Sequence, residues 1–169
     1  NTTGSRNTAM GASSFSTNST GSDDTAVGHA ALSANTTGDR NTAVGRASLQ
    51  TNTSGANNTA VGYQSFNANT TGNDNVVVGR NALDANTTAN YNTAVGSIAL
   101  GANITGCRNT ALGYATLNLN QTGNDNTAVG YAALNVNTGS NNTAVGKDSL
   151  IANTTGTENT AMGQSALLN

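Results

Sequence analysis

Residues 58–74 read NTAVGYQSFNANTTGND, and close variants of this 17-residue unit fill the chain. Ten copies begin at Asn7, Asp24, Asn41, Asn58, Asn75, Asn92, Asn109, Asn126, Asn142 and Asn159. They are 17 residues apart, except for 16 between Asn126 and Asn142. A fixed period of this length is typical of a solenoid, in which each coil buries its apolar side against its neighbours. We therefore predict an all-β parallel β-solenoid (β-roll) of about ten 17-residue coils.

The predicted solenoid is a single domain over residues 1–169. Because the sequence opens inside a repeat, at Asn1, we expect it to be a segment of a longer protein. No apolar run approaches the ~20 residues of a membrane-spanning helix, so direct membrane insertion is not expected of this segment.

Each position of the repeat forms a column along the predicted solenoid. Alternation in a strand puts Thr59 and Val61 on one face and Ala60 on the other. We expect two core columns, each holding one larger apolar residue per coil. The first is Phe15, Leu32, Leu49, Phe66, Leu83, Leu100, Leu117, Leu134, Leu150 and Leu167. The second is Met10, Val27, Val44, Val61, Val78, Val95, Leu112, Val129, Val145 and Met162.

The remaining columns predict corners. The unbroken glycine column that includes Gly62 indicates a backbone with positive φ. The Asn-Thr-Thr-Gly segment, as at residues 69–72, favours a turn, and its asparagines are placed to stack as a hydrogen-bonded ladder. The simplest coil has two strands joined by two corners. The 16-residue repeat has its deletion in this segment, at residues 137–139, where a loop absorbs it.

The composition argues against nucleic acid as a partner and against a disulfide within the chain. Charged residues are 8% of the chain, the formal net charge is −2, and the six Lys and Arg residues are scattered. A basic face cannot form from so few charges, so nucleic acid is not an expected partner. The single cysteine, Cys107, lies in a variable column and permits no disulfide within the chain.

No residue pattern predicts catalysis, a cofactor or a metal site. His29 is the only histidine and lies in an exposed, variable column. A calcium-binding repeat needs an acid in nearly every coil. Here the position before the Asn-Thr-Ala-Val-Gly motif is acidic only at Asp23, Asp74, Asp125 and Glu158. The column after the corner glycine contains three tyrosines, which are candidate surface contacts: Tyr63, Tyr114 and Tyr131.

The repeat resembles the head repeats of trimeric autotransporter adhesins (YadA-type). Thr59-Ala60-Val61-Gly62 stands where that family has a Val-Ala-Ile-Gly-like strand, and the likeness extends over all ten copies. The coils here are longer, and we place the extra residues in the Asn-Thr-Thr-Gly corner. The resemblance implies a left-handed β-roll that assembles as a homotrimer. Similar repeats occur in phage tail-fibre-like proteins.

Two functions remain open. The first is a structural or adhesive segment of an extracellular fibre or surface adhesin, on a cell or a phage particle. Its partners are copies of itself and host or matrix surface molecules. The second is ice binding through a threonine ladder, which requires this column to face water. The ladder is Thr8, Thr25, Thr42, Thr59, Thr93, Thr110, Thr127, Thr143 and Thr160. Because we place the Val column in the core, we expect the threonines to point inward, which favours the fibre.

Overall fold

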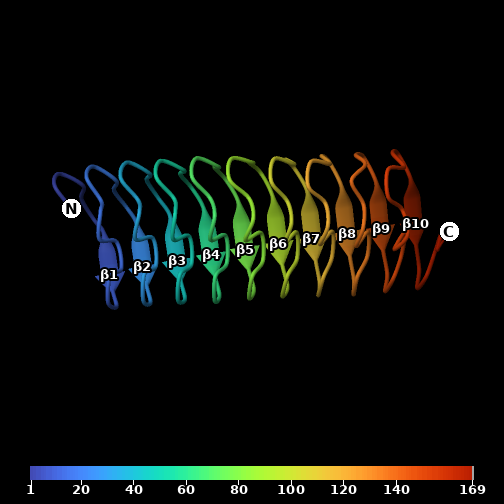
Figure 1. Cartoon of the computed structure of the whole chain (residues 1–169), viewed down its shortest axis with the longest axis horizontal. Helices are drawn as coiled ribbons and strands as arrows, with labels where there is room; N and C mark the ends of the chain where they lie inside the picture. The colour runs from blue at the N-terminus through green and yellow to red at the C-terminus, as the bar shows by residue number, and fades with distance from the viewer. Residues whose placement is uncertain (169) are drawn as a thin grey trace.

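The computed structural model describes residues 1–168 and contains one parallel sheet of ten strands, stacked in chain order (Figure 1). The described part of the chain has no helix, and hence none long and apolar enough to cross a membrane. The strands are β1 (Thr8–Met10), β2 (Thr25–Val27), β3 (Thr42–Val44), β4 (Thr59–Val61), β5 (Val76–Val78), β6 (Thr93–Val95), β7 (Thr110–Leu112), β8 (Thr127–Val129), β9 (Thr143–Val145) and β10 (Thr160–Met162). The predicted parallel β-solenoid is confirmed.

Equivalent residues pair along the whole sheet. Thr42 lies opposite Thr59, and Val44 lies opposite Val61. The short coil keeps this register, since Thr127 still pairs with Thr143 across the 16-residue interval. The deletion is absorbed at residues 137–139. There, Asn137 Nδ2 donates to the carbonyl of Gly139, two residues later, whereas the equivalent asparagine of other coils, such as Asn52, donates to a carbonyl three residues later. The prediction that this loop accommodates the missing residue is confirmed.

Each coil contains one strand, so the prediction of two strands per coil is wrong. The rest of the coil bends through residues with positive φ, such as Ala30 at 56°, Leu32 at 50° and Arg40 at 56°. A strand needs consecutive residues in the extended β region, and residues with positive φ at alternate positions interrupt that conformation, so no second strand forms. The backbone still bonds between coils, for example from Leu49 N to Ser65 O at 3.0 Å.

The glycine column forms the corner that the sequence predicts. Its φ angles lie between 119° and 139°, a region that residues with a Cβ rarely adopt. A Cβ on Gly62 would also lie 2.6 Å from the carbonyl oxygen of Gly79 in the next coil. Both conformation and close approach therefore require glycine here.

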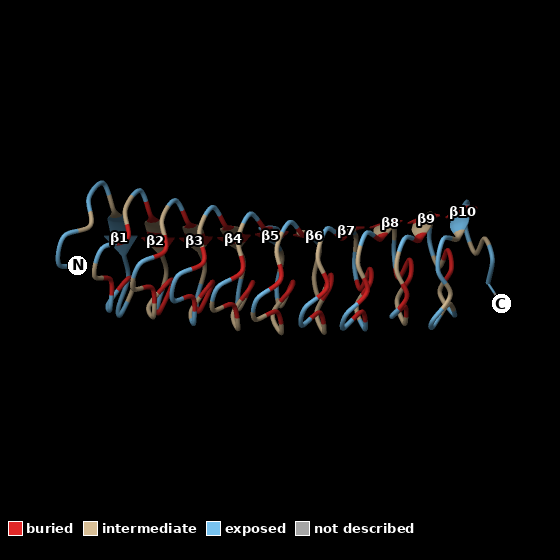
Figure 2. Ribbon diagram, turned by 90° about the horizontal axis from the view of Figure 1, so that it is seen from above, coloured by how far each residue is buried: buried red, intermediate tan, exposed pale blue. Residues whose placement is uncertain are grey.

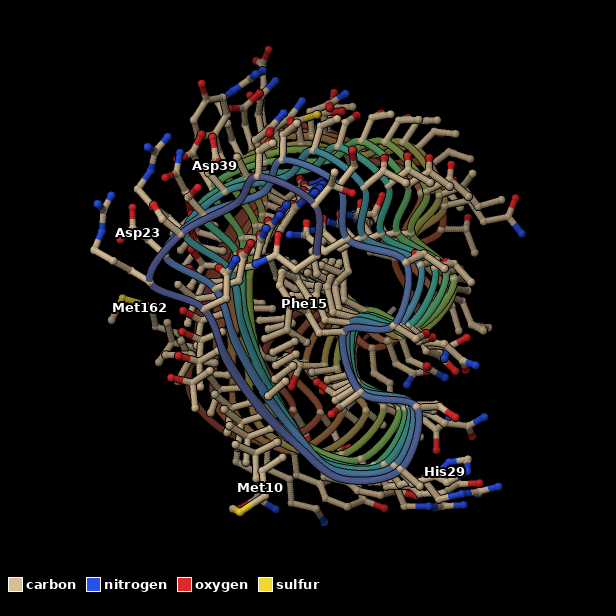
Figure 3. All side chains as sticks on the ribbon, turned by 90° about the vertical axis from the view of Figure 1, so that its left-hand side faces the viewer. Met10, Phe15, Asp23, His29, Asp39 and Met162 are labelled. Atoms are coloured by element: carbon tan, nitrogen blue, oxygen red, sulfur yellow. The ribbon has the colours of Figure 1, made fainter. Side chains whose placement is uncertain are left out.

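The strand faces are the reverse of the prediction. The Ala column is fully buried, from Ala26 to Ala144, with Val77 in its place in β5. The Val column, predicted to be core, lies on the outer face together with the Thr column. Phe15 lies in the interior of the coil (Figure 3), and its Leu/Phe column forms one buried cluster with the Ala column. Because these large side chains already fill the interior, small residues suffice on the inner side of the strands. The core is therefore built from Ala, Leu and Phe, with buried residues on the inner side of each coil (Figure 2).

Two asparagine ladders complete the interior. Asn52 Nδ2 donates to Asn35 Oδ1 at 2.9 Å and to the Gly55 carbonyl at 2.9 Å, which confirms the predicted ladder. A second ladder contains the asparagines that open each motif. In it, Asn75 N donates to Asn58 Oδ1 at 3.1 Å. The side chains of both ladders replace the hydrogen bonds that a second sheet would have made.

The stack twists along its axis. Met10 and Met162 hold the same position in β1 and β10, yet they point in different directions when the solenoid is viewed end on (Figure 3). Right-handed strand twist is the usual origin of such rotation between stacked strands. The outer face of the sheet is consequently a twisted ribbon and not a plane.

Candidate functional site: the outer sheet face and its borders

The outer face of the sheet is a ribbon two side chains wide, which we call the Thr–Val face. It comprises the first and third residues of β1 to β10. Nine of these twenty side chains are threonines, eleven are Val, Leu or Met, and none is charged. Exposed members include Val76 at 44% and Leu112 at 36%. The face is fully exposed in β1, β5 and β10 and half-buried over most of the other strands. A continuous uncharged strip of this composition that stays at least partly accessible is uncommon on a monomeric soluble protein.

The threonines of this face point outward, so the expectation that they lie inside is wrong. Within residues 1–168, no hydrogen bond joins their hydroxyls to the protein. Turn threonines behave differently: Thr36 Oγ1 donates to the Thr53 carbonyl at 2.9 Å, and Thr53 Oγ1 donates to Thr70 O at 3.0 Å. The hydroxyls of the Thr–Val face are therefore available to water or to a partner.

One border of the face is net acidic. It consists of the two residues that precede each motif, and its charged members are Arg6, Asp23, Asp39, Arg40, Asp74, Arg108, Asp125 and Glu158. Three arginines against five acids give a formal charge of −2. Arg108 makes a two-pronged bond to Asp125, at 2.7 and 2.9 Å, and Arg6 pairs with Asp23 in the same way. We call this side the acidic border.

The opposite border is net basic and aromatic. It consists of the two residues after each corner glycine, and its charged members are Arg46, Arg80, Lys147 and Asp148, together with His29. With His29 neutral, three cations against one acid give +2. Figure 3 places His29 and Asp23 on opposite sides of the coil. We call this side the basic border.

The three predicted surface tyrosines lie exposed on the basic border. Tyr114 stacks on Tyr131 with ring centroids 5.3 Å apart and planes 18° apart. Lys147 Nζ lies 5.9 Å from the Tyr131 ring centroid, and the Arg46 guanidinium lies 5.5 Å from that of Tyr63. Because equivalent residues of adjoining coils lie one above the other, these exposed side chains stack along the solenoid axis. The sequence analysis predicted their exposure but not this stacking.

His29, Cys107 and the acids do not converge on a common centre. Within residues 1–168, no group of three or more His, Cys, Asp or Glu side chains is placed to hold a metal ion. His29 lies exposed on the basic border, and Cys107 is half-buried in the column before the acidic border residue Arg108. Cys107 makes a long contact from its Sγ to the Thr105 carbonyl at 3.5 Å.

Asp24 is the one acid inside the described core. It replaces asparagine in the second ladder, where its Oδ1 accepts from Asn41 N at 2.7 Å. Burial raises the pKa of Asp24 to about 6, although the bonds from Asn41 act in the opposite direction. Unlike asparagine, an ionised Asp24 has no donor for the carbonyl of Gly38, the counterpart of the Asn41 Nδ2 bond to Gly55 O at 2.9 Å. When it is ionised, Asp24 therefore stabilises the ladder less than an asparagine would.

We expect Asp24→Asn to stabilise the protein by about 2 kcal/mol at pH 7. Because the folded-state pKa of Asp24 is raised, its protonated form contributes stability fully below the unfolded pKa of 3.8. That contribution is lost as the pH rises through about 6. Urea unfolding at pH 4 and pH 7 measures the effect. The gain from the substitution should shrink at pH 4, and an equal gain at both values would contradict it.

Comparisons with protein-family models, with curated proteins and with solved structures found no match.

Proposed function

We propose that this chain is a non-enzymatic structural or adhesive segment of an extracellular fibre or surface adhesin, in which parallel copies associate through the Thr–Val face as a homotrimer. The observation that carries the proposal is that face, which is uncharged, more than half aliphatic, at least partly exposed in every coil, and continuous over ten strands. Placement outside the cell, the trimeric state and possible host or matrix ligands rest on the resemblance to adhesin and tail-fibre repeats.

The two borders favour copies that run in the same direction. When two such faces meet with parallel axes, the acidic border of one copy lies along the basic border of the other. When the axes are antiparallel, like borders meet and repel. A face roughly 7 Å by 45 Å, from the strand spacings, covers about 300 Å², well below the ~800 Å² per partner of a standard interface. Contacts between the borders therefore have to contribute, and their charges then select the parallel arrangement.

The twist of the stack also favours a copy of the chain as partner. Identical solenoids have the same twist, so their faces can remain in contact along their whole length. Burial of Val and Met side chains would add apolar area to a core that otherwise consists largely of Ala and Leu. Cyclic association of this kind is the common form of homo-oligomer.

The proposal predicts self-association that depends on the Thr–Val face. Sedimentation equilibrium at micromolar concentration should show a trimer, and Val61→Lys with Val78→Lys should convert it to monomer, because charges buried without a partner are strongly unfavourable. Thr71→Lys is the matched control: its side chain is exposed on a turn outside the face, and it should leave the trimer intact. A monomeric wild-type protein would overturn the proposal.

Ice binding is the second candidate, and the outward threonine ladder favours it. Nine unbonded hydroxyls, repeating at the ~4.8 Å strand spacing, form a regular array of hydrogen-bonding groups. The same face cannot bind ice while buried between copies, so the two functions exclude each other. Nanolitre osmometry on the monomeric fraction tests this candidate: it should show thermal hysteresis or ice shaping, and their absence would end it.

A further inference from the structure

Two tyrosines of the basic border lie against each other in adjoining coils, and we call them the tyrosine pair. Tyr114 belongs to the coil of residues 109–125, and Tyr131 belongs to the 16-residue coil, residues 126–141. Their ring centroids are 5.3 Å apart and their planes differ by 18°. The backbone holds the two residues together, because Ala132 N donates to the Tyr114 carbonyl at 2.9 Å. The fold itself therefore keeps these two phenols adjacent.

Both rings of the tyrosine pair are accessible from solvent. Tyr114 is 49% exposed and Tyr131 is 52% exposed. Neither hydroxyl makes a hydrogen bond to any of residues 1–168. Exposed side chains change rotamer within picoseconds to nanoseconds, so the rings reorient while the backbones beneath them stay paired. Carbon atoms ortho to the two hydroxyls therefore meet repeatedly, and an oxidant in solution reaches both rings.

The other two tyrosines have no aromatic neighbour in their columns. Tyr63 lies between two arginines, and the guanidinium of Arg46 is 5.5 Å from its ring centroid. Tyr91 lies on the acidic border between Asp74 and Arg108. In the part of the chain that the structure describes, two phenols thus come together only at the tyrosine pair.

The tyrosine pair also connects the two coils whose corner lacks backbone hydrogen bonds. At a typical junction, Thr53 N donates to the Thr70 carbonyl at 2.9 Å, and the next amide donates to the same oxygen at 3.1 Å. The equivalent donors between the coils of the tyrosine pair are Gln121 N and Thr122 N. Neither makes a hydrogen bond among the described residues, because the deletion at residues 137–139 lies opposite them. The deletion therefore weakens the junction that the tyrosine pair spans.

We propose that the tyrosine pair is a site of oxidative cross-linking, at which a peroxidase and hydrogen peroxide join the two rings through a carbon–carbon bond. Each phenol gives up one electron and its hydroxyl proton, which leaves a phenoxyl radical with spin density on its ortho carbons. One ortho carbon of each ring forms the new bond. The hydrogen on each of these carbons then moves to the ring oxygen, which restores both phenols. The two electrons and two protons reduce one hydrogen peroxide to two molecules of water.

The cross-link covalently joins the 16-residue coil to the coil before it. It supplies a connection at the junction where the corner bonds are missing, and it requires no change of fold, because the two rings are already in contact. The site lies on the basic border, outside the Thr–Val face, and all the atoms that react belong to one chain. The proposal is therefore independent of self-association.

Oxidation of the purified protein by a haem peroxidase and hydrogen peroxide tests the proposal. Trypsin cuts after Arg108 and Lys147, so both rings lie in one peptide, residues 109–147. That peptide should lose the mass of two hydrogen atoms, show dityrosine fluorescence, and yield no backbone fragments between the two tyrosines in tandem mass spectrometry. The chain should still run as a monomer on a denaturing gel. Absence of the cross-link, or cross-links formed only between chains, would overturn the proposal.

Matched variants locate the cross-link. Tyr114→Phe keeps the aromatic ring but removes one phenol, so it should abolish the cross-link, whereas Tyr63→Phe should leave the yield unchanged. An equal yield from Tyr114→Phe and wild type would show that other residues react. The variant with Val61→Lys and Val78→Lys should cross-link like wild type. Its result separates this proposal from the proposed trimer, because that variant lacks the association face.

The urea midpoint measures whether the cross-link stabilises the junction. Joining residues 114 and 131 closes a loop and restricts the unfolded chain, so cross-linked wild type should unfold at a higher urea concentration than untreated protein. Oxidised Tyr114→Phe is the control, because peroxide also reaches the exposed Met10 and Met162. Equal midpoints for cross-linked wild type and oxidised Tyr114→Phe would overturn the stabilising role.

Discussion

Gly62→Ala is expected to lower the free energy of unfolding by about 3 kcal/mol or more. A φ of 134° strains any residue with a Cβ, at a cost of about 1–3 kcal/mol. The added methyl would also lie 2.6 Å from the Gly79 carbonyl oxygen. The coils cannot separate to relieve this contact without lengthening the bonds between β4 and β5. Conformational strain and steric overlap therefore act together.

Two matched glycine variants separate these contributions. Gly163 lies in the same column with φ of 119°, but in the last coil a Cβ meets nothing within 4 Å. Gly163→Ala should therefore show the cost of strain alone, about 1–3 kcal/mol. Gly101 does not have positive φ, and a Cβ there meets the movable end of Asn118 first, so Gly101→Ala should be nearly neutral. Urea unfolding followed by circular dichroism ranks the three, and equal losses would refute the steric argument.

The coil, its register and its corners were predictable because a repeat restricts the geometry so strongly. Once equivalent residues must stack, an unbroken glycine column has few explanations other than a special φ or a close approach, and Gly62 shows both. The asparagine column of the Asn-Thr-Thr-Gly corner was likewise predictable as a ladder, since side-chain groups inside a coil need partners. The second strand predicted for each coil was wrong.

The direction of the strand faces was not predictable from alternation. Period two assigns Thr59 and Val61 to one face and Ala60 to the other, but it does not say which face is inside. The greater hydrophobicity of valine favoured the Val column as the inner one, whereas the narrow interior of the coil accommodates the smaller alanine. The useful signal was the tolerance of each column: the outer one accepts Val, Leu and Met, whereas the inner one holds Ala in all coils except at Val77. Positions with little room restrict volume more than polarity.

The surface sites followed only partly from the sequence. Exposure of Tyr63, Tyr114 and Tyr131 was predictable from the variety of their column, and the structure confirms it. The stack of Tyr114 on Tyr131 required the coils to be placed side by side. Left-handed conformations at non-glycine positions such as Leu49, with φ of 50°, had no residue preference that would reveal them.

Asn58→Ala is the second substitution with a large expected effect, about 2–5 kcal/mol of destabilisation. Asn58 Nδ2 donates to the Gly72 carbonyl at 2.8 Å, and Asn58 Oδ1 accepts from Asn75 N at 3.1 Å. Truncation leaves Asn75 N and Nδ2 without this acceptor, and a buried group left unsatisfied costs about 1–3 kcal/mol. The Gly72 carbonyl keeps the bond from Asn69 Nδ2 at 3.1 Å and contributes less to the loss. Asn58 is fully buried, so water does not replace the lost bonds without opening the coil.

Asn58→Asp distinguishes the donor from the acceptor. The carboxylate keeps the acceptor for Asn75 N but loses the donor to Gly72, and burial should raise its pKa as it does at Asp24. Its cost should therefore be largest at neutral pH and decrease as the pH is lowered, whereas the cost of Asn58→Ala should not depend on pH. Thr71→Ala, on an exposed turn, is the control and should be neutral. If Asn58→Ala unfolded at the same urea concentration as Thr71→Ala, the ladder would fill space without stabilising the solenoid.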